Sequence, residues 1–127
     1  MTSVPEGLRY TKEHEWVLVE GDVATVGITD YAQDSLSDVV FVELPTIGAP
    51  VRQFQKVGLV ESVKSVSDLY TPIGGVVVAV NTELEAAPET VNKDPYGKGW
   101  MWKVKLADRG QLDTLLDAAG YQGFLGH

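Results

Sequence analysis

Cysteine is absent from the 127-residue sequence, and histidine occurs only at His14 and His127. The lack of thiols excludes both a disulfide framework and a catalytic thiolate. Two histidines without cysteine cannot assemble a His or Cys metal cluster, and the carboxylates form no loop with calcium-binding spacing. The glycines follow no phosphate-binding pattern, and no Gly-x-Ser-x-Gly motif accompanies His14. The sequence thus lacks the parts of an enzyme, and we predict no metal site.

Basic residues are also scarce. Lys and Arg total 10 against 18 Asp and Glu, which gives a net charge of -8 and a pI near 4.6. Nucleic acids and anionic membranes select basic patches, so we expect neither as a partner. Residues 1–6 lack the basic region and apolar core of a signal peptide, and no apolar run reaches the length of a membrane span. We therefore expect a cytoplasmic protein with a single domain, residues 1–127.

One lysine stands apart in this acidic sequence. Residues 13–51 contain eight acids and no Lys or Arg, and Lys64 is the only base between residues 57 and 92. A lone exposed lysine usually contributes solubility and nothing more. A single amine in an acidic surround, however, offers an enzyme few rival lysines. This pattern favours covalent attachment at Lys64.

The residues around Lys64 predict a hairpin over about residues 57–71. Val60, Val63 and Val66 supply apolar contacts and are separated by polar residues, while neither Gly nor Pro interrupts the run to Asp68. We therefore expect a stiff hairpin that presents Lys64 at or near its tip.

Alternating and β-branched segments predict a mainly β chain. Strands are expected at residues 14–20, 23–28, 39–44, 76–80 and 100–106. Segment 39–44 is too apolar to be half exposed along its whole length, and segment 76–80 is expected to be buried. A short helix is expected from about residue 29 to residue 36, and residues 83–96 are expected to be irregular.

A C-terminal helix is predicted over about residues 108–119. Leu112, Leu115 and Leu116 form an i, i+3, i+4 stripe, and Gly120 is expected to end the helix.

A weak internal repeat adds a hypothesis about architecture. Residues 26–29 followed by 37–40 resemble residues 57–60 followed by 67–70. Two strand-turn-strand units of this kind would pack as a sandwich or a flattened barrel.

Six ordered groups of residues between Tyr10 and Leu125 carry a specific resemblance. They are His14-Glu15-Trp16, Gly27 to Gln33, Asp38 to Pro45, Glu61 to Ser65, Pro72 with Gly75, and Asn92 to Trp100. Together they resemble the H-protein family of the glycine cleavage system, whose members are lipoyl carriers. The resemblance implies a lipoyl/biotinyl-type β-sandwich or flattened-barrel hybrid with short helices and a C-terminal helix.

The resemblance also implies roles for four residues. Lys64 would carry lipoate in amide linkage, as N6-lipoyllysine. Glu61 and Gly75 would help lipoylating enzymes to recognise the hairpin, and Glu15 would lie near the docked arm. We further hypothesise a groove, lined by Glu15 and the helix at residues 30–36, that shelters the cargo.

The implied function is that of a carrier and not of an enzyme. The arm would take the aminomethyl group of glycine from glycine decarboxylase (the P protein) to the aminomethyltransferase (the T protein). Dihydrolipoamide dehydrogenase (the L protein) would then accept its electrons.

Three alternatives stay open at this stage. The first is a lipoyl domain of a 2-oxo acid dehydrogenase, although such domains are shorter and lead into a linker. The second is a biotin carrier, although methionines would then replace Val63 and Ser65 beside the lysine. The third is a lipoyl donor for other enzymes, or an unmodified binding module.

The chain departs from the usual family pattern at three positions. Ser37 stands where glycine is usual, Gly74 where serine is common, and Ser35 where some members have histidine. If φ is positive at position 37, Ser37 would hold a backbone conformation that glycine adopts without strain and serine does not.

Overall fold

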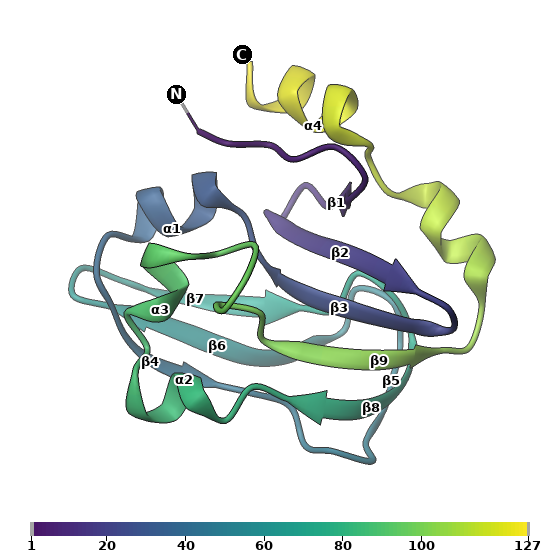
Figure 1. Ribbon diagram of the computed structural model, residues 1–127, viewed down its shortest axis with the longest axis horizontal. Coiled ribbons are helices and arrows are strands. Elements are labelled where there is room, and N and C mark those ends of the chain that lie inside the picture. Colours follow the sequence, from purple (N-terminus) through teal and green to yellow (C-terminus); the bar gives the residue numbers. More distant parts are fainter. Residues whose placement is uncertain (1, 127) are drawn as a thin grey trace.

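The computed structural model describes residues 2–126, in which nine strands form two antiparallel sheets (Figure 1). The six-stranded sheet contains, in spatial order, β1 (Arg9–Tyr10), β2 (Glu15–Glu20), β3 (Val23–Ile28), β9 (Trp102–Leu106), β8 (Gly75–Val80) and β5 (Pro50–Val51). The three-stranded sheet contains β4 (Val39–Glu43), β6 (Lys56–Ser62) and β7 (Val66–Tyr70). The predicted mainly β sandwich with short helices is confirmed.

Four α-helices and one 3₁₀ helix join or cover the sheets within the described residues. They are α1 (Asp30–Leu36), α2 (Glu83–Ala86), α3 (Thr90–Lys93), the 3₁₀ helix η1 (Arg109–Thr114) and α4 (Ala118–Leu125). Within residues 2–126, no helix has the length and apolar character needed to cross a membrane.

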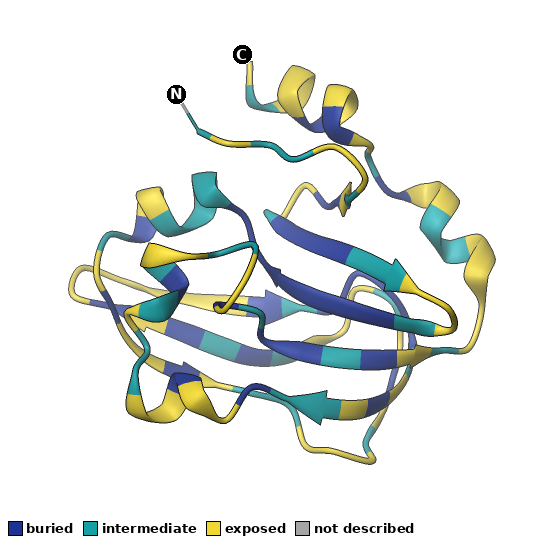
Figure 2. Ribbon diagram, viewed as in Figure 1, coloured by how far each residue is buried: buried dark blue, intermediate teal, exposed yellow. Residues whose placement is uncertain are grey.

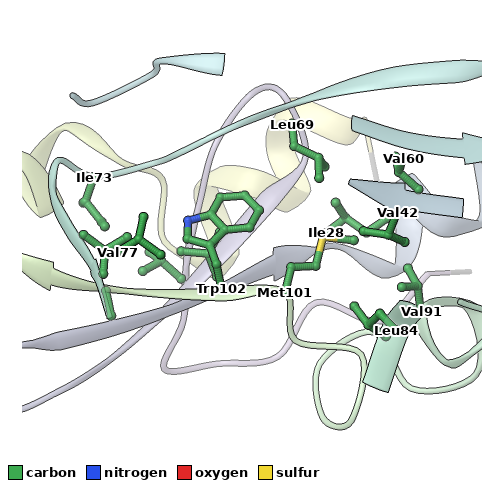
Figure 3. Close-up of a cluster of buried hydrophobic side chains, with 14 of the residues drawn as sticks. Ile28, Val42, Val60, Leu69, Ile73, Val77, Leu84, Val91, Met101 and Trp102 are labelled. Carbon is green, nitrogen blue, oxygen red and sulfur yellow. The ribbon is translucent and has the colours of Figure 1, made fainter. Parts of the chain in front are cut away.

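The main core lies between the two sheets (Figure 3). Val60 and Leu69 of the small sheet and Val77 and Trp102 of the large sheet are all at most 1% exposed. Residues opposite one another in an antiparallel pair point to the same face, so Val42, the partner of Val60, is buried with it. Burial of each such side chain contributes about 1.5–3 kcal/mol to stability.

A second apolar cluster covers the other face of the large sheet. Val17 points into the main core, whereas its neighbour Trp16 packs with Tyr10, Ala118 and Tyr121. The rings of Tyr10 and Tyr121 are stacked with centroids 4.7 Å apart. This cluster holds the N-terminal segment and α4 against the sheet, which explains why β3 is buried along nearly its whole length (Figure 2).

The predicted C-terminal helix over about residues 108–119 is wrong in its bounds. The chain forms η1, then extended backbone, then α4. Leu116 leaves the helical path because its N–H and C=O both bond to Tyr10, at 2.9 and 2.7 Å. Asp117 accepts a bond from the Gly120 N–H at 2.8 Å and caps α4, so Gly120 lies inside a helix and does not end one.

Two predicted strands are more exposed than expected. Val40 and Phe41 on β4 are 49% and 50% exposed, and Val76 and Val78 on β8 are 42% and 41% exposed. Each antiparallel sheet turns only one face toward the main core, so Val76 and Val78, on either side of the buried Val77, point outward. On β4 the β-bulge between Val39 and Phe41 leaves two consecutive residues exposed. The segment at residues 83–96, expected to be irregular, contains the short helices α2 and α3.

The internal repeat does not correspond to two equivalent units. The strands of its second copy, β6 and β7, pair with each other in the small sheet. Those of its first copy, β3 and β4, lie in different sheets and are joined by α1.

Candidate functional site

Lys64 lies in the tight turn between β6 and β7, at the tip of the hairpin that the sequence predicted. The buried side chain of Ser62 organises this turn: its Oγ accepts bonds from the N–H of Ser65 at 3.1 Å and of Lys64 at 3.4 Å. The Ser62 N–H donates to the Ser65 carbonyl at 2.8 Å. Side-chain and backbone bonds thus fix the turn without glycine, while Lys64 itself is exposed.

Neighbouring elements hold this turn in place and leave the lysine amine available. The Val63 N–H donates to the Asp38 carbonyl at 3.0 Å, which ties the turn to the start of β4. Within residues 2–126, no carboxylate lies within ion-pair distance of the Lys64 ammonium. The hairpin therefore presents an exposed amine, with no ion-pair partner among the described residues, on a well-anchored backbone.

A groove of about 270 Å³ begins beside this turn and runs along the free edge of β7. We call it the Glu15 groove. Its wall includes Ser65, which directly follows Lys64 in the chain, and its other lining side chains include His14, Glu15, Tyr31, Leu36 and Leu69. An arm attached at Lys64 would therefore start at one end of a partly apolar groove.

Glu15 is the buried acid of this groove and is 1% exposed. One carboxyl oxygen bonds to the Thr11 hydroxyl at 2.7 Å, and the other accepts from the Tyr70 N–H at 3.5 Å. Burial disfavours the charged form and raises the pKa of Glu15 to about 8, although both bonds lower it. The carboxyl is therefore mainly protonated at pH 7, which the sequence did not indicate.

His14 lines the same groove with a positive φ of 70°. Its Nδ1 and the Thr29 Oγ both lie 2.8 Å from the Tyr121 hydroxyl. Thr29 is fully buried, and its Oγ also accepts the Ala32 N–H at the start of α1. Among the described residues the Thr29 hydroxyl hydrogen has only the Tyr121 oxygen as an acceptor, so the arrangement that satisfies every hydrogen has Thr29 donate to Tyr121. Tyr121 then donates to His14, whose Nδ1 is the acceptor. Burial lowers the pKa of His14, in keeping with this neutral form.

The predicted site residues do not all lie together. Glu61 is exposed on β6, three residues before Lys64. Gly75 begins β8, at the end of the sandwich opposite the lysine turn (Figure 1). It has a φ of 151°, and a Cβ there would overlap the Lys105 carbonyl oxygen on β9. Close packing between β8 and β9 thus explains why position 75 is glycine, independently of any role in recognition by lipoylating enzymes.

The three departures from the family pattern have different surroundings. Ser35 lines the Glu15 groove and is exposed. Ser37 ends α1 with φ 62° and ψ -149°, a conformation that suits glycine. Gly74 is buried, and a Cβ there would lie 3.0 Å from the Val51 carbonyl oxygen.

Sequence reasoning did not find the residues that position the groove side chains. Thr11 is bonded to Glu15 four positions later in the chain, and this short spacing is only a weak signal in the sequence that the two side chains meet. Tyr70 acts through its backbone, and Tyr121 reaches His14 from 107 positions away. Neither contact has a signature in the local sequence.

Comparison with known proteins gives the family. A sequence model described as "Glycine cleavage H-protein" matches residues 8–127. The chain belongs to the glycine cleavage H-protein family. It is 57% identical over 124 residues to the glycine cleavage system H protein of Symbiobacterium thermophilum, covering 98% of this chain and 97% of that one. It is also 57% identical over 122 residues to the H protein of Thermus thermophilus, covering 96% and 95% of the two chains.

A solved structure agrees with this assignment. The crystal structure of a glycine cleavage system H protein from Mycobacterium marinum matches with a TM-score of 0.90 and 41% identity, and the match covers 98% of this chain and 100% of that one. The H-protein family match includes the N-terminal hairpin and α4, which decides against the shorter lipoyl domain of a 2-oxo acid dehydrogenase and against a biotin carrier.

The chain is therefore the lipoylated aminomethyl carrier of the glycine cleavage system, and it is a carrier and not a catalyst. H proteins carry lipoate. Membership of this system implies the P, T and L proteins as partners.

Proposed function

We propose that Lys64 is the lipoyl attachment residue of this carrier. The observation that carries the proposal is the exposed amine, without an ion-pair partner in residues 2–126, on a turn fixed by Ser62, with the Glu15 groove beginning at the next residue. The residues present fit a lipoyl group, because the groove combines apolar walls for its hydrocarbon and a buried acid for an amine cargo. When bound, the lipoyl group supplies a disulfide that can accept the aminomethyl group and electrons.

Glu61 and Gly75 are proposed to help the lipoylating enzymes to recognise the hairpin. For Glu61, support comes from its exposure on β6 and its nearness to Lys64 in the chain. Gly75 lies at the other end of the sandwich from Lys64. Any effect of Gly75 on recognition would therefore be indirect, through the path of the backbone between β7 and β8. Its role stays a prediction.

The Glu15 groove is proposed to shelter the aminomethyl cargo from water. Tyr31 and Leu36 would cover it on the α1 side, and Val66 and Leu69 on the β7 side. Glu15 holds a proton in the empty groove at pH 7 because burial raises its pKa. An ammonium beside the carboxyl would favour ionisation, so Glu15 would release its proton and pair with the cargo.

The roles of the partners follow from this cargo. The P protein would load the arm from glycine, the T protein would remove the one-carbon unit, and the L protein would reoxidise the arm. Tethering at Lys64 makes each delivery effectively unimolecular. Interaction with lipoylating enzymes, the absence of nucleic-acid and membrane partners, and a cytoplasmic location stay predictions.

Intact mass and a peptide map test the attachment. The protein is incubated with lipoate, ATP and a lipoate ligase, beside Lys64→Arg and the control Lys56→Arg, which alters an exposed lysine on the same hairpin. We expect one lipoyl increment on Lys64 in the wild type and in Lys56→Arg, and none in Lys64→Arg. An increment on another lysine, or none in the wild type, would exclude Lys64 as the attachment site.

A second experiment tests Glu15 separately from attachment. Fully lipoylated wild type, Glu15→Gln and Glu13→Gln are charged with glycine by the P protein, and the loss of amine from each purified carrier is followed over time. Glu13, an exposed acid at the rim of the groove, is the control. We expect faster loss from Glu15→Gln alone. Equal lifetimes in all three proteins would remove the role of Glu15.

A further inference from the structure

The outer face of the small sheet carries an exposed apolar patch beside Lys64. We define the outer patch as Val40, Phe41, Glu61, Val63 and Val66. The four apolar side chains are 49%, 50%, 67% and 59% exposed in that order. Exposed apolar side chains that gather in one place, with few charges among them, are typical of interaction surfaces.

The strand register brings the members of the outer patch together. Phe41 on β4 is opposite Glu61 on β6, and Glu61 is opposite Val66 on β7. Directly opposed residues share a face of the sheet, so Glu61 lies in one row between two apolar side chains. A β-bulge between Val39 and Phe41 interrupts the pairing at Val40, which is also exposed.

The turn continues this row toward the lysine. Val63 directly precedes Lys64 and is bonded through its N–H to the carbonyl of Asp38, at the start of β4. The outer patch therefore extends across all three strands up to the residue that bears the amine. The Glu15 groove is lined by the free edge of β7, α1 and the turn before β2, and Val66 is the one member of the outer patch that also lines it.

We propose that the outer patch is the docking surface for the enzyme that acylates Lys64. This inference rests on the proposed lipoylation of Lys64. The amine sits on a four-carbon stem, so an enzyme that joins it to an acyl group must approach the hairpin itself. Enzymes that use the finished arm meet its far end and do not need this contact.

The chemistry of the acylation agrees with this occupant. The Nζ lone pair attacks the acyl carbon of a lipoyl adenylate, AMP leaves with the bonding electron pair, and the amine loses a proton.

The complementary surface of the enzyme is apolar and places a cation against Glu61, which has no basic partner within the described residues. Phe41 is the aromatic anchor of this contact, because truncation of a large aromatic side chain at an interface typically costs more binding energy than truncation of its neighbours.

The test uses full-length protein with the double substitution Val40→Thr and Phe41→Thr, because neither residue lines the Glu15 groove. Threonine is β-branched and therefore suits a strand, and its hydroxyl makes the position polar. The control carries Ile47→Thr and Val78→Thr, which remove apolar groups of 59% and 41% exposure elsewhere. Initial rates of lipoylation by a lipoate ligase with lipoate and ATP are measured for each, and urea unfolding checks that the variants fold.

We expect kcat/KM for lipoylation to fall about tenfold or more in the patch variant, mainly through KM, and to stay within about twofold in the control. After long incubation with excess ligase, the fully lipoylated patch variant should be reduced by dihydrolipoamide dehydrogenase at the wild-type rate. Unchanged lipoylation kinetics would overturn the inference, even if the patch proved to mediate self-association by sedimentation. An equal loss in the dehydrogenase reaction would overturn the assignment to the acylating enzyme. A wild type that accepts no lipoate would remove the proposed attachment first and this inference with it.

Discussion

Replacing Glu15 with glutamine should change how the stability of this protein depends on pH. The carboxyl is 1% exposed, and its pKa rises from 4.5 to about 8 on burial in the fold. Below pH 4.5 the folded and unfolded states both hold the proton. Between pH 4.5 and about 8 the unfolded state loses it and the folded state keeps it, so stability falls as the pH rises through this window.

The magnitude follows from the size of the pKa shift. Each pH unit within the window lowers the free energy of unfolding by about 1.4 kcal/mol, which amounts to about 3 kcal/mol by pH 7. The glutamine of the variant cannot ionise, but its amide oxygen can accept from the Tyr70 N–H, and its amide N–H can donate to the Thr11 Oγ in place of the bond that Thr11 donates to the carboxyl. Glu15→Gln should therefore match the wild type near pH 4.5 and exceed its stability by about 3 kcal/mol at pH 7.

Urea unfolding followed by tryptophan fluorescence at several pH values from 4.5 to 8 measures this difference. The comparison uses the difference between the two proteins, because His14 is present in both and its lowered pKa acts in the opposite direction below pH 6.5. Glu13→Gln, an exposed change in the same turn, is the control. A stability difference that does not vary with pH would refute a buried neutral Glu15.

Three further substitutions test the backbone and the support of the groove. Ser37→Gly should raise the free energy of unfolding by about 1 kcal/mol, because the φ of 62° and ψ of -149° at this position suit glycine; urea unfolding at pH 7 measures it, and a loss of stability would contradict the argument. Gly58→Ala should lower it by about 3 kcal/mol, since the new Cβ would overlap the Glu43 carbonyl oxygen and push β4 away from β6; thermal unfolding unchanged from the wild type would show that the strands can shift at little cost. Tyr121→Phe should cost about 2 kcal/mol, because it leaves the buried Thr29 hydroxyl and His14 without a partner, and hydrogen exchange at the start of α1 should rise with it; protection equal to that of the wild type would count against the link.

The lysine hairpin could be predicted because its determinants are local. β-Branched residues favour the strands, and the strands end within one residue of the predicted limits of 57 and 71. The unusual isolation of Lys64 among acids is also visible in the sequence alone. The family motifs added the fold and the carrier function, both of which the comparisons support.

Long-range contacts explain what local patterns missed. Leu115 and Leu116 fit a helical stripe, but Tyr10, more than 100 positions earlier, takes the backbone bonds of Leu116 and interrupts the helix. The run of apolar residues on β4 suggested burial on both faces, but which face of a strand is covered depends on the elements that pack there. The state of Glu15 depends on burial by segments distant in sequence, so no reading of its neighbours could predict a raised pKa.

The proposed roles of Lys64, attachment of the arm and delivery of its cargo to the groove, place two requirements on one side chain. Attachment needs an enzyme to approach the amine closely, and the outer patch lies on the solvent side of the small sheet where such an approach is open. Protection of the cargo needs exclusion of water, and the Glu15 groove lies along the free edge of β7, where α1 and the turn before β2 close around it. Lys64 follows Val63 of the outer patch and precedes Ser65 of the groove, so its stem begins between the two surfaces. A backbone change that displaced the turn would therefore affect both functions, whereas changes at Phe41 or Glu15 should affect one each.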